Sequence, residues 1–189
     1  ESDIVRLEEI INKTLVMIYA GSAQDELLCT GVVMALVDDA YILVPYEKIR
    51  GEDEVQVQFW NEEMTKAQFW SHDEELGIAI IKINGSDIDK QLSGAIVCAE
   101  VTSVGKMSRG YDCVYEGNAF GGLVPAYTGK IADISETDDI YDLYFRIFYT
   151  DVVMDGVEDG FLFDGDGCLL GMVLSKYADP KNSTISAVA

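Results

Sequence analysis

Serine and cysteine nucleophiles are available in this sequence, but only one histidine is present to act as their base. Serine and cysteine hydrolases use an imidazole as the base that takes the proton from the nucleophile. His72 is the only histidine among the 189 residues. It lies in the polar segment 71–75, directly before an apolar run, so we expect a solvent-exposed turn. The sequence therefore argues against an imidazole-dependent hydrolase, while a serine–lysine pair stays open as an alternative.

Four cysteines are the second set of reactive groups, and they are widely spaced. They are Cys29, Cys98, Cys113 and Cys168. No two of them form a C-x-x-C pair, so we expect neither a zinc site nor any other cofactor. Two disulfides and a set of buried free thiols both fit this spacing, and the sequence leaves that choice open.

The segment Asp164–Gly167 alternates Asp and Gly, as the start of a calcium-binding EF-hand loop does. Such a loop spreads its ligands over about 12 residues and ends in Glu. Here an apolar run begins at Cys168, which is too early for that spacing. Because Asp-Gly is also a strong hairpin signal, we predict a tight β-turn.

Acidic residues dominate the charge of the chain. The sequence holds 13 Lys and Arg against 34 Asp and Glu, a formal net charge of −21. This charge repels nucleic-acid backbones and anionic lipid surfaces, so neither is expected as a partner. No apolar run reaches the roughly 18 residues that span a bilayer, and the first residues lack a basic, then apolar, targeting pattern. We therefore expect no membrane insertion by this segment.

Part of the negative charge is concentrated in one stretch. No Lys or Arg lies between Arg146 and Lys176. That stretch contains the acidic residues Asp151, Asp155, Glu158, Asp159, Asp164 and Asp166. A ligand bound near this stretch is expected to be cationic, such as a basic peptide or a metal ion.

Short apolar runs separated by turn signals predict an all-β protein. A short helix is expected first, because Ile4, Leu7 and Ile11 have helical spacing. Strands are then predicted over residues 15–19, 30–37, 40–44, 55–60, 64–70, 78–83, 95–97, 112–116, 124–134, 143–150, 160–164, 168–174 and 183–188. This spacing favours a sandwich or barrel. The polar segment 84–94 predicts a linker between a first lobe, 1–83, and a second, 95–189.

Two tryptophans, Trp60 and Trp70, lie on successive predicted strands. Aromatic residues on neighbouring strands can stack across a sheet. We expect them to pair in this way, in a core or half-buried position, with a ligand platform as the alternative.

The order of several motifs resembles the protease domain of the HtrA (DegP-like) serine proteases, a trypsin-fold family. The motifs are CTGVVM at 29–34, YILV at 41–44, GIAIIKI at 77–83, YTD at 149–151, GVEDGFLF at 156–163 and LLGM at 169–172. The resemblance spans nearly the whole chain. It implies a trypsin-like double β-barrel, with two six-stranded Greek-key barrels and a short N-terminal helix.

The resemblance breaks at the catalytic positions. Alignment of the motifs places Glu47 at the family's histidine, Gly77 at its aspartate and Glu158 at its nucleophilic serine. All three differ from the Ser-His-Asp triad, so the resemblance implies a degenerate, inactive protease. The remaining candidates for a binding cleft are the residues around the former nucleophile, namely Asp155, Gly156, Asp159 and Gly160.

The two glutamates at former triad positions leave several hypotheses open. In the family's fold Glu47 and Glu158 would lie near each other. Paired carboxylates can act as general acid and base or can bind a cation. The simplest interpretation is that a lost active site has drifted to polar, water-facing residues.

We therefore expect a pseudoprotease that acts as a peptide-binding, protein-binding, sensing or scaffolding module. The alternatives are an active peptidase with a relocated site and a cation-binding structural domain. From the family we further expect an extracytoplasmic location, a homo-oligomer and an additional PDZ-like domain in the parent chain.

Overall fold

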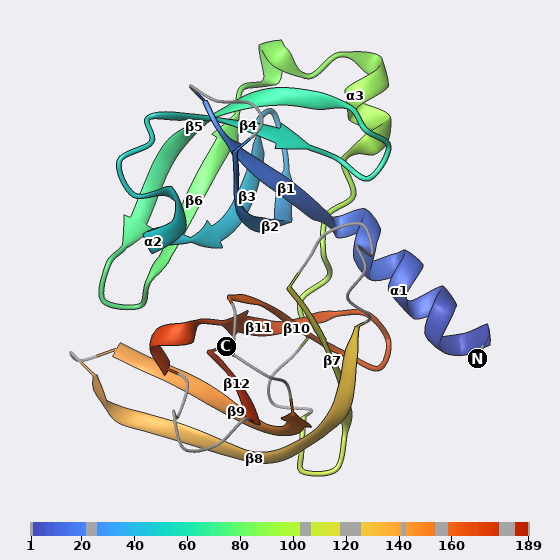
Figure 1. Ribbon diagram of the computed structural model, residues 1–189, viewed down its shortest axis with the longest axis vertical. Coiled ribbons are helices and arrows are strands. Elements are labelled where there is room, and N and C mark those ends of the chain that lie inside the picture. Colours follow the sequence, from blue (N-terminus) through green and yellow to red (C-terminus); the bar gives the residue numbers. More distant parts are fainter. Residues whose placement is uncertain are drawn as a thin grey trace. The chain divides into compact units, whose positions relative to one another are not determined.

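The computed structural model describes residues 2–21, 26–102, 107–117, 126–140, 143–153, 159–177 and 184–188 (Figure 1). The chain divides into two compact units, with the boundary between Ala99 and Glu100. Each unit is built around a closed barrel of six antiparallel strands. The predicted double β-barrel is confirmed.

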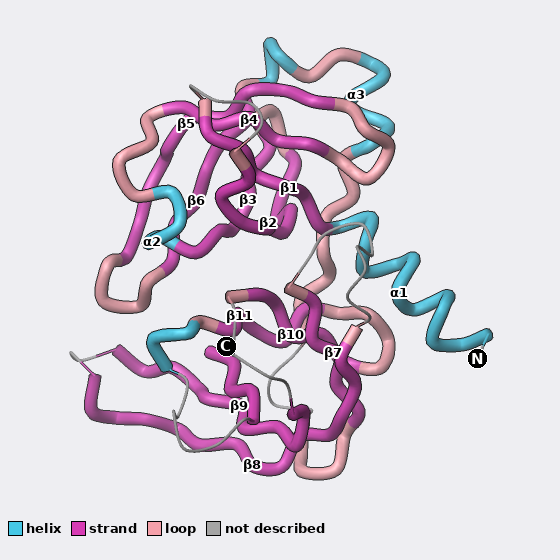
Figure 2. The backbone as a smooth tube through the Cα atoms, in the orientation of Figure 1, coloured by secondary structure: helices cyan, strands magenta, loops and turns pink. Residues whose placement is uncertain are grey.

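The first unit begins with helix α1 (Ser2–Thr14). Its strands are β1 (Leu15–Ala20), β2 (Leu27–Leu36), β3 (Ala40–Pro45), β4 (Glu54–Gln58), β5 (Met64–Asp73) and β6 (Ile78–Ile83). They pair in the order β1-β2-β3-β6-β5-β4, and the pairing of β1 with β4 closes the barrel (Figure 2). Short helix α2 (Tyr46–Ile49) follows β3 directly.

Alternating apolar residues form the core of the first barrel. Along β6, every second side chain is buried, and Ile81 and Ile83 are fully inaccessible. The register places Ile81 beside Ile42 of β3. Because successive side chains of a strand point to opposite faces, this alternation turns one face of each strand inward.

The segment predicted as a linker packs against the first barrel. It contains a 3-10 turn, η1 (Gly85–Asp87), and helix α3 (Lys90–Ala95). The side chain of Asp89 caps α3 by accepting a hydrogen bond from the Leu92 N–H at 2.8 Å. Leu92 and Ala95 are buried in the core of the first barrel. The structure thus differs from the prediction of a linker over 84–94 and a strand over 95–97, because a capped helix carries apolar residues into the core.

The second unit contains the other six strands. They are β7 (Asp112–Glu116), β8 (Tyr127–Ile140), β9 (Leu143–Val153), β10 (Gly160–Asp164), β11 (Leu169–Val173) and β12 (Thr184–Val188). Their order is β10-β11-β12-β9-β8-β7, closed by the pairing of β10 with β7. Phe148 is completely buried in the core of this barrel, and Phe161 and Phe163 are also inaccessible to solvent. All five residues of β10 are buried, which explains its continuous apolar sequence.

The turn between β10 and β11 confirms the predicted hairpin. The Asp164 carboxylate accepts hydrogen bonds from the N–H groups of Asp166 and Cys168, both at 2.9 Å. Gly167 adopts a φ of +87°, which glycine tolerates better than other residues. The aspartate that suggested a calcium ligand therefore organises its own backbone.

No helix in the described part of the chain is long and apolar enough to span a bilayer.

Candidate functional site: the predicted triad positions

Glu47 lies on α2, the short helix that follows β3 directly. Ile49 anchors this helix, since its side chain is 1% exposed in the barrel core. Glu47 is on the opposite, solvent-facing side, with 59% of its side chain exposed. The fold thus presents residue 47 at the barrel surface.

Gly77 lies beside α2, although the two are far apart in the sequence. The backbone N–H of Tyr46 donates a hydrogen bond to the Gly77 carbonyl at 2.9 Å. The last pair of the β3–β6 ladder joins Pro45 to Ile78. The structure therefore brings together two of the three positions that the sequence resemblance assigned to the triad.

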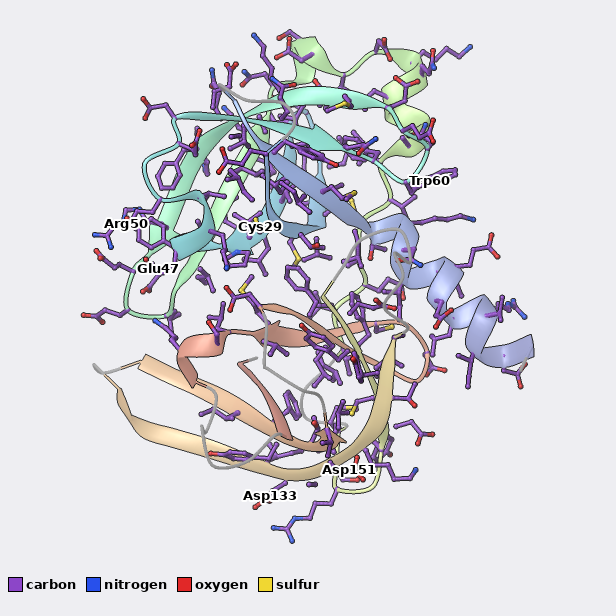
Figure 3. All side chains as sticks on the ribbon, viewed as in Figure 1. Cys29, Glu47, Arg50, Trp60, Asp133 and Asp151 are labelled. Carbon is purple, nitrogen blue, oxygen red and sulfur yellow. The ribbon has the colours of Figure 1, made fainter. Side chains whose placement is uncertain are left out.

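An ion-paired arginine connects these two positions. Arg50 lies 3.6 Å from Glu47 and 3.3 Å from Glu74, a residue of the β5–β6 turn that ends at Gly77 (Figure 3). Its guanidinium also stands over the Tyr46 ring, 5.8 Å from the ring centroid. All three ion-pair partners are more than half exposed, so each pair contributes little to folding stability. They place one guanidinium between two carboxylates on this surface.

The only histidine is part of the same surface. His72 belongs to β5, paired with Ala79, so the prediction of a turn at 72 is wrong. After a β-bulge between Phe69 and Ser71, the pairing of β5 with β6 continues through His72 to Asp73. The imidazole is exposed, as expected, but stacks on Tyr46 with ring centroids 4.5 Å apart and 19° between the planes. Sequence reasoning missed Tyr46, Arg50 and Glu74, and only the short spacing of Arg50 after Glu47 could have suggested an ion pair.

The chain is similar to known proteins in its fold. No protein-family model and no curated protein matches the chain. Solved structures do match. The HtrA-type protease AlgW with a tripeptide aligns with a TM-score of 0.72 and 20% identity, over 98% of this chain and 59% of its own. The same protease with a decapeptide aligns with a TM-score of 0.73 and 16% identity, over 98% of this chain and 63% of its own. A serine endoprotease from Yersinia pestis aligns with a TM-score of 0.70 and 18% identity, over 97% of this chain and 61% of its own. The chain has the fold of an HtrA-type protease domain.

This match confirms the fold that the sequence motifs implied. The chain spans about three fifths of the length of these HtrA-type structures. In the structure Glu47 follows β3 and Gly77 precedes β6, and their assignment to the family's triad positions stays a prediction. An exposed carboxylate is a much weaker base than imidazole, and glycine has no side chain to orient a base.

Two of the candidates from the former nucleophile loop, Asp159 and Gly160, are described in the second unit. Asp159 accepts a hydrogen bond from the N–H of Ser175 at 2.7 Å. A Cβ on Gly160 would lie 2.7 Å from both the Glu116 carbonyl oxygen and the Tyr115 ring, so β10 and β7 need glycine here. Asp155, Gly156 and Glu158 lie outside the described residues, and their roles stay predictions.

The four cysteines are free thiols in this structure. Cys113 is buried in the second barrel, and burial raises the pKa of its thiol to about 12, helped by the nearby Asp151 and Asp112. Burial also raises the pKa of Cys98 and of Cys168. All three thiols are therefore poor nucleophiles at neutral pH, since the thiolate is the reactive form.

Restoring the family's aspartate at Gly77 is expected to strain the chain. Gly77 has a φ of +80°, a conformation that costs other residues about 1–2 kcal/mol. We expect Gly77→Asp to lower the free energy of unfolding by about 1 kcal/mol, the low end of that range, because Asp enters this region more readily than most residues. Urea denaturation followed by circular dichroism measures this change.

Two controls separate backbone strain from charge. Gly77→Asn carries the same conformational cost without the carboxylate. At Gly94, in α3, an added Cβ meets nothing within 4 Å, so Gly94→Ala is expected to be neutral or stabilising. If Gly77→Asp is as stable as the parent protein, the turn does not disfavour the triad aspartate.

Proposed function

We propose that this domain is a catalytically inactive member of the HtrA-type fold that acts as a peptide- or protein-binding module. The observation that carries the proposal is the pair of adjacent positions, Glu47 and Gly77. The first holds a carboxylate paired with Arg50, and the second holds a glycine at positive φ. Neither residue can take the role of its counterpart in a Ser-His-Asp triad.

The position of the only histidine supports the same conclusion. His72 stacks on Tyr46 in a strand, and its ring also lies 5.4 Å from that of Phe69. An imidazole that serves as a base needs a hydrogen bond to its nucleophile and an orienting carboxylate. The aromatic packing of His72 is typical of a structural role.

We propose a basic peptide or protein segment as the ligand. The net charge of −21 favours cationic partners and disfavours nucleic acid. Two of the similar AlgW structures contain peptides, which supports a peptide as the ligand class for this fold. As in the HtrA family, we further propose an extracytoplasmic location, assembly into a homo-oligomer and a PDZ-like domain in the parent chain.

A fluorophosphonate probe tests the loss of catalysis. We expect no covalent labelling of any serine and no cleavage of casein under conditions in which trypsin is fully labelled. Labelling at a serine that is lost on denaturation would show a relocated active site and overturn the proposal. The test does not depend on knowing the ligand.

A panel of Lys- and Arg-rich peptides tests the binding role. We expect binding that weakens as the salt concentration rises, because exposed charges are screened over about 10 Å at 0.1 M salt. Acidic peptides of the same length are the matched control. Equal binding of both panels, or binding that salt does not change, would contradict the proposed ligand class.

A further inference from the structure

A groove lies between helix α1 and Trp60 in the first unit, well away from the former triad positions. It has a volume of about 420 Å³. Its lining residues are Val5, Glu8, Glu9, Asn12, Lys13 and Trp60. The five helical residues recur at spacings of three and four, so they share one face of α1. Figure 3 shows Trp60 and Glu47 on opposite sides of the first barrel.

Trp60 is held in a fixed orientation at this groove. The indole N–H donates a hydrogen bond to the Ala95 carbonyl at the end of α3, at 2.9 Å. The side chain is nevertheless 39% exposed, which is unusual for so large an apolar ring. The predicted pairing of Trp60 with Trp70 is wrong, since Trp70 instead makes an edge contact with Tyr41. The ring of Trp60 is thus left as one wall of the groove.

The groove already attracts a positive charge from the chain itself. The Lys13 ammonium lies 5.5 Å from the centroid of the Trp60 ring and 3.1 Å from a carboxylate oxygen of Glu9. An aromatic face and a carboxylate both favour a cation. Lys13 is 40% exposed and Glu9 67% exposed, so this internal contact is weak and can be displaced.

Two carboxylates complete the lining of the groove. Glu8 and Glu9 lie on the same face of α1 and both line the groove. Together with Trp60, these residues present two carboxylates and an aromatic wall, and Lys13 is the one cation among the lining residues.

The geometry points to this groove as a binding site for the guanidinium group of an arginine side chain in a peptide or protein. A guanidinium is planar, stacks on tryptophan and carries several N–H donors in a fixed arrangement. It can therefore stack on Trp60 while it donates to Glu8 and Glu9. Lysine offers a compact, strongly hydrated charge that cannot stack in this way.

This inference is independent of whether the domain has lost protease activity. It deepens only the proposed preference for basic ligands, to which it adds a defined location. Its test must therefore separate binding at this groove from general attraction to an acidic protein.

Fluorescence of Trp60 measures occupancy directly. In a Trp70→Phe background, Trp60 is the only tryptophan, since the chain contains two. We expect acetyl-Gly-Arg-Gly-amide to change the emission of Trp60 until the site is saturated. The same peptide with lysine in place of arginine is expected to bind more weakly. The peptide with neutral citrulline in place of arginine is the shape-matched control. An equal response to the citrulline peptide would overturn the inference.

Substitutions in the groove give opposite expected effects. Lys13→Met removes the competing cation and is expected to tighten arginine binding about two- to fivefold. Glu9→Gln is expected to weaken it by a similar factor, whereas Glu54→Gln, an exposed charge on β4, is expected to leave it unchanged. Thermal melts confirm that each variant is folded.

Two results would contradict the site. If Glu54→Gln weakens binding as much as Glu9→Gln, the attraction belongs to the whole acidic surface. If Lys13→Met leaves binding unchanged or weakens it, the incoming arginine does not compete for the position of Lys13. If casein cleavage is found while these effects hold, the proposed loss of catalysis fails and the arginine site stands.

Discussion

Replacing Phe161 by Ala is expected to lower the free energy of unfolding by about 3–5 kcal/mol, the usual cost of removing a buried phenylalanine ring. Phe161 is fully buried in β10, between β7 and β11. The loss combines the transfer of the ring from the core to water with the cavity that remains. Urea denaturation with a separate probe in each barrel would show which unit unfolds first.

An exposed position at the end of β9 offers a matched control for this change. Val153 is 63% exposed, so Val153→Ala is expected to change the stability by less than about 0.5 kcal/mol. A loss of less than about 1 kcal/mol for Phe161→Ala would mean that this ring is not part of a packed core.

Replacing Asp164 by Ala is expected to cost about 3 kcal/mol. Besides the two backbone N–H groups of its own turn, the carboxylate accepts a hydrogen bond from the Thr102 hydroxyl at 2.5 Å. Thr102 belongs to the segment that enters the second unit, and its N–H donates to the Leu169 carbonyl at 3.0 Å. Hydrogen bonds to a charged acceptor contribute about 1.5–3 kcal/mol each, and water can replace part of those lost in a turn.

The turn itself supplies the control for Asp164. Asp166 is exposed, and only its backbone N–H is used in the turn, so Asp166→Ala should be nearly neutral. Asp164→Asn keeps the acceptor shape without the charge. Its melting temperature is expected to lie between those of Asp164→Ala and Asp166→Ala. Equal melting temperatures for Asp164→Ala and Asp166→Ala would show that the carboxylate does not hold the turn.

Strands with strict patterns could be predicted from the sequence. The predicted bounds of β6, β7 and β10 agree with the structure, because each is an apolar or alternating run ended by turn residues. The end of β8 could not be predicted in this way. Its polar segment 135–139 pairs with β9, as in the match of Glu136 with Arg146, and the partner strand rather than the local sequence keeps it extended.

The candidate site was only partly predictable. Motif order predicted Glu47 and Gly77 as former triad positions, and the β3–β6 ladder brings the two residues together. The bridge from Glu47 through Arg50 to Glu74 joins a helix to a distant hairpin turn, so no local pattern reveals it. The acidic stretch suggested a cationic ligand, but Asp159 and Asp164 accept backbone hydrogen bonds within their own barrel.

The sequence by itself determined the chemistry that is available, namely one histidine and a strong negative charge. It also determined the alternation of apolar and polar residues that predicts the strands of two β-barrels. Composition limits which catalytic groups and which charged partners are available, whatever the fold. Apolar residues recur at every second position because successive side chains of a strand point to opposite faces. Only the tertiary structure decided which side chains meet. It placed His72 on Tyr46, gave Arg50 two carboxylates and set Trp60 against α1 to form a groove. These contacts join residues from separate elements, and strand register and packing position them rather than local preference.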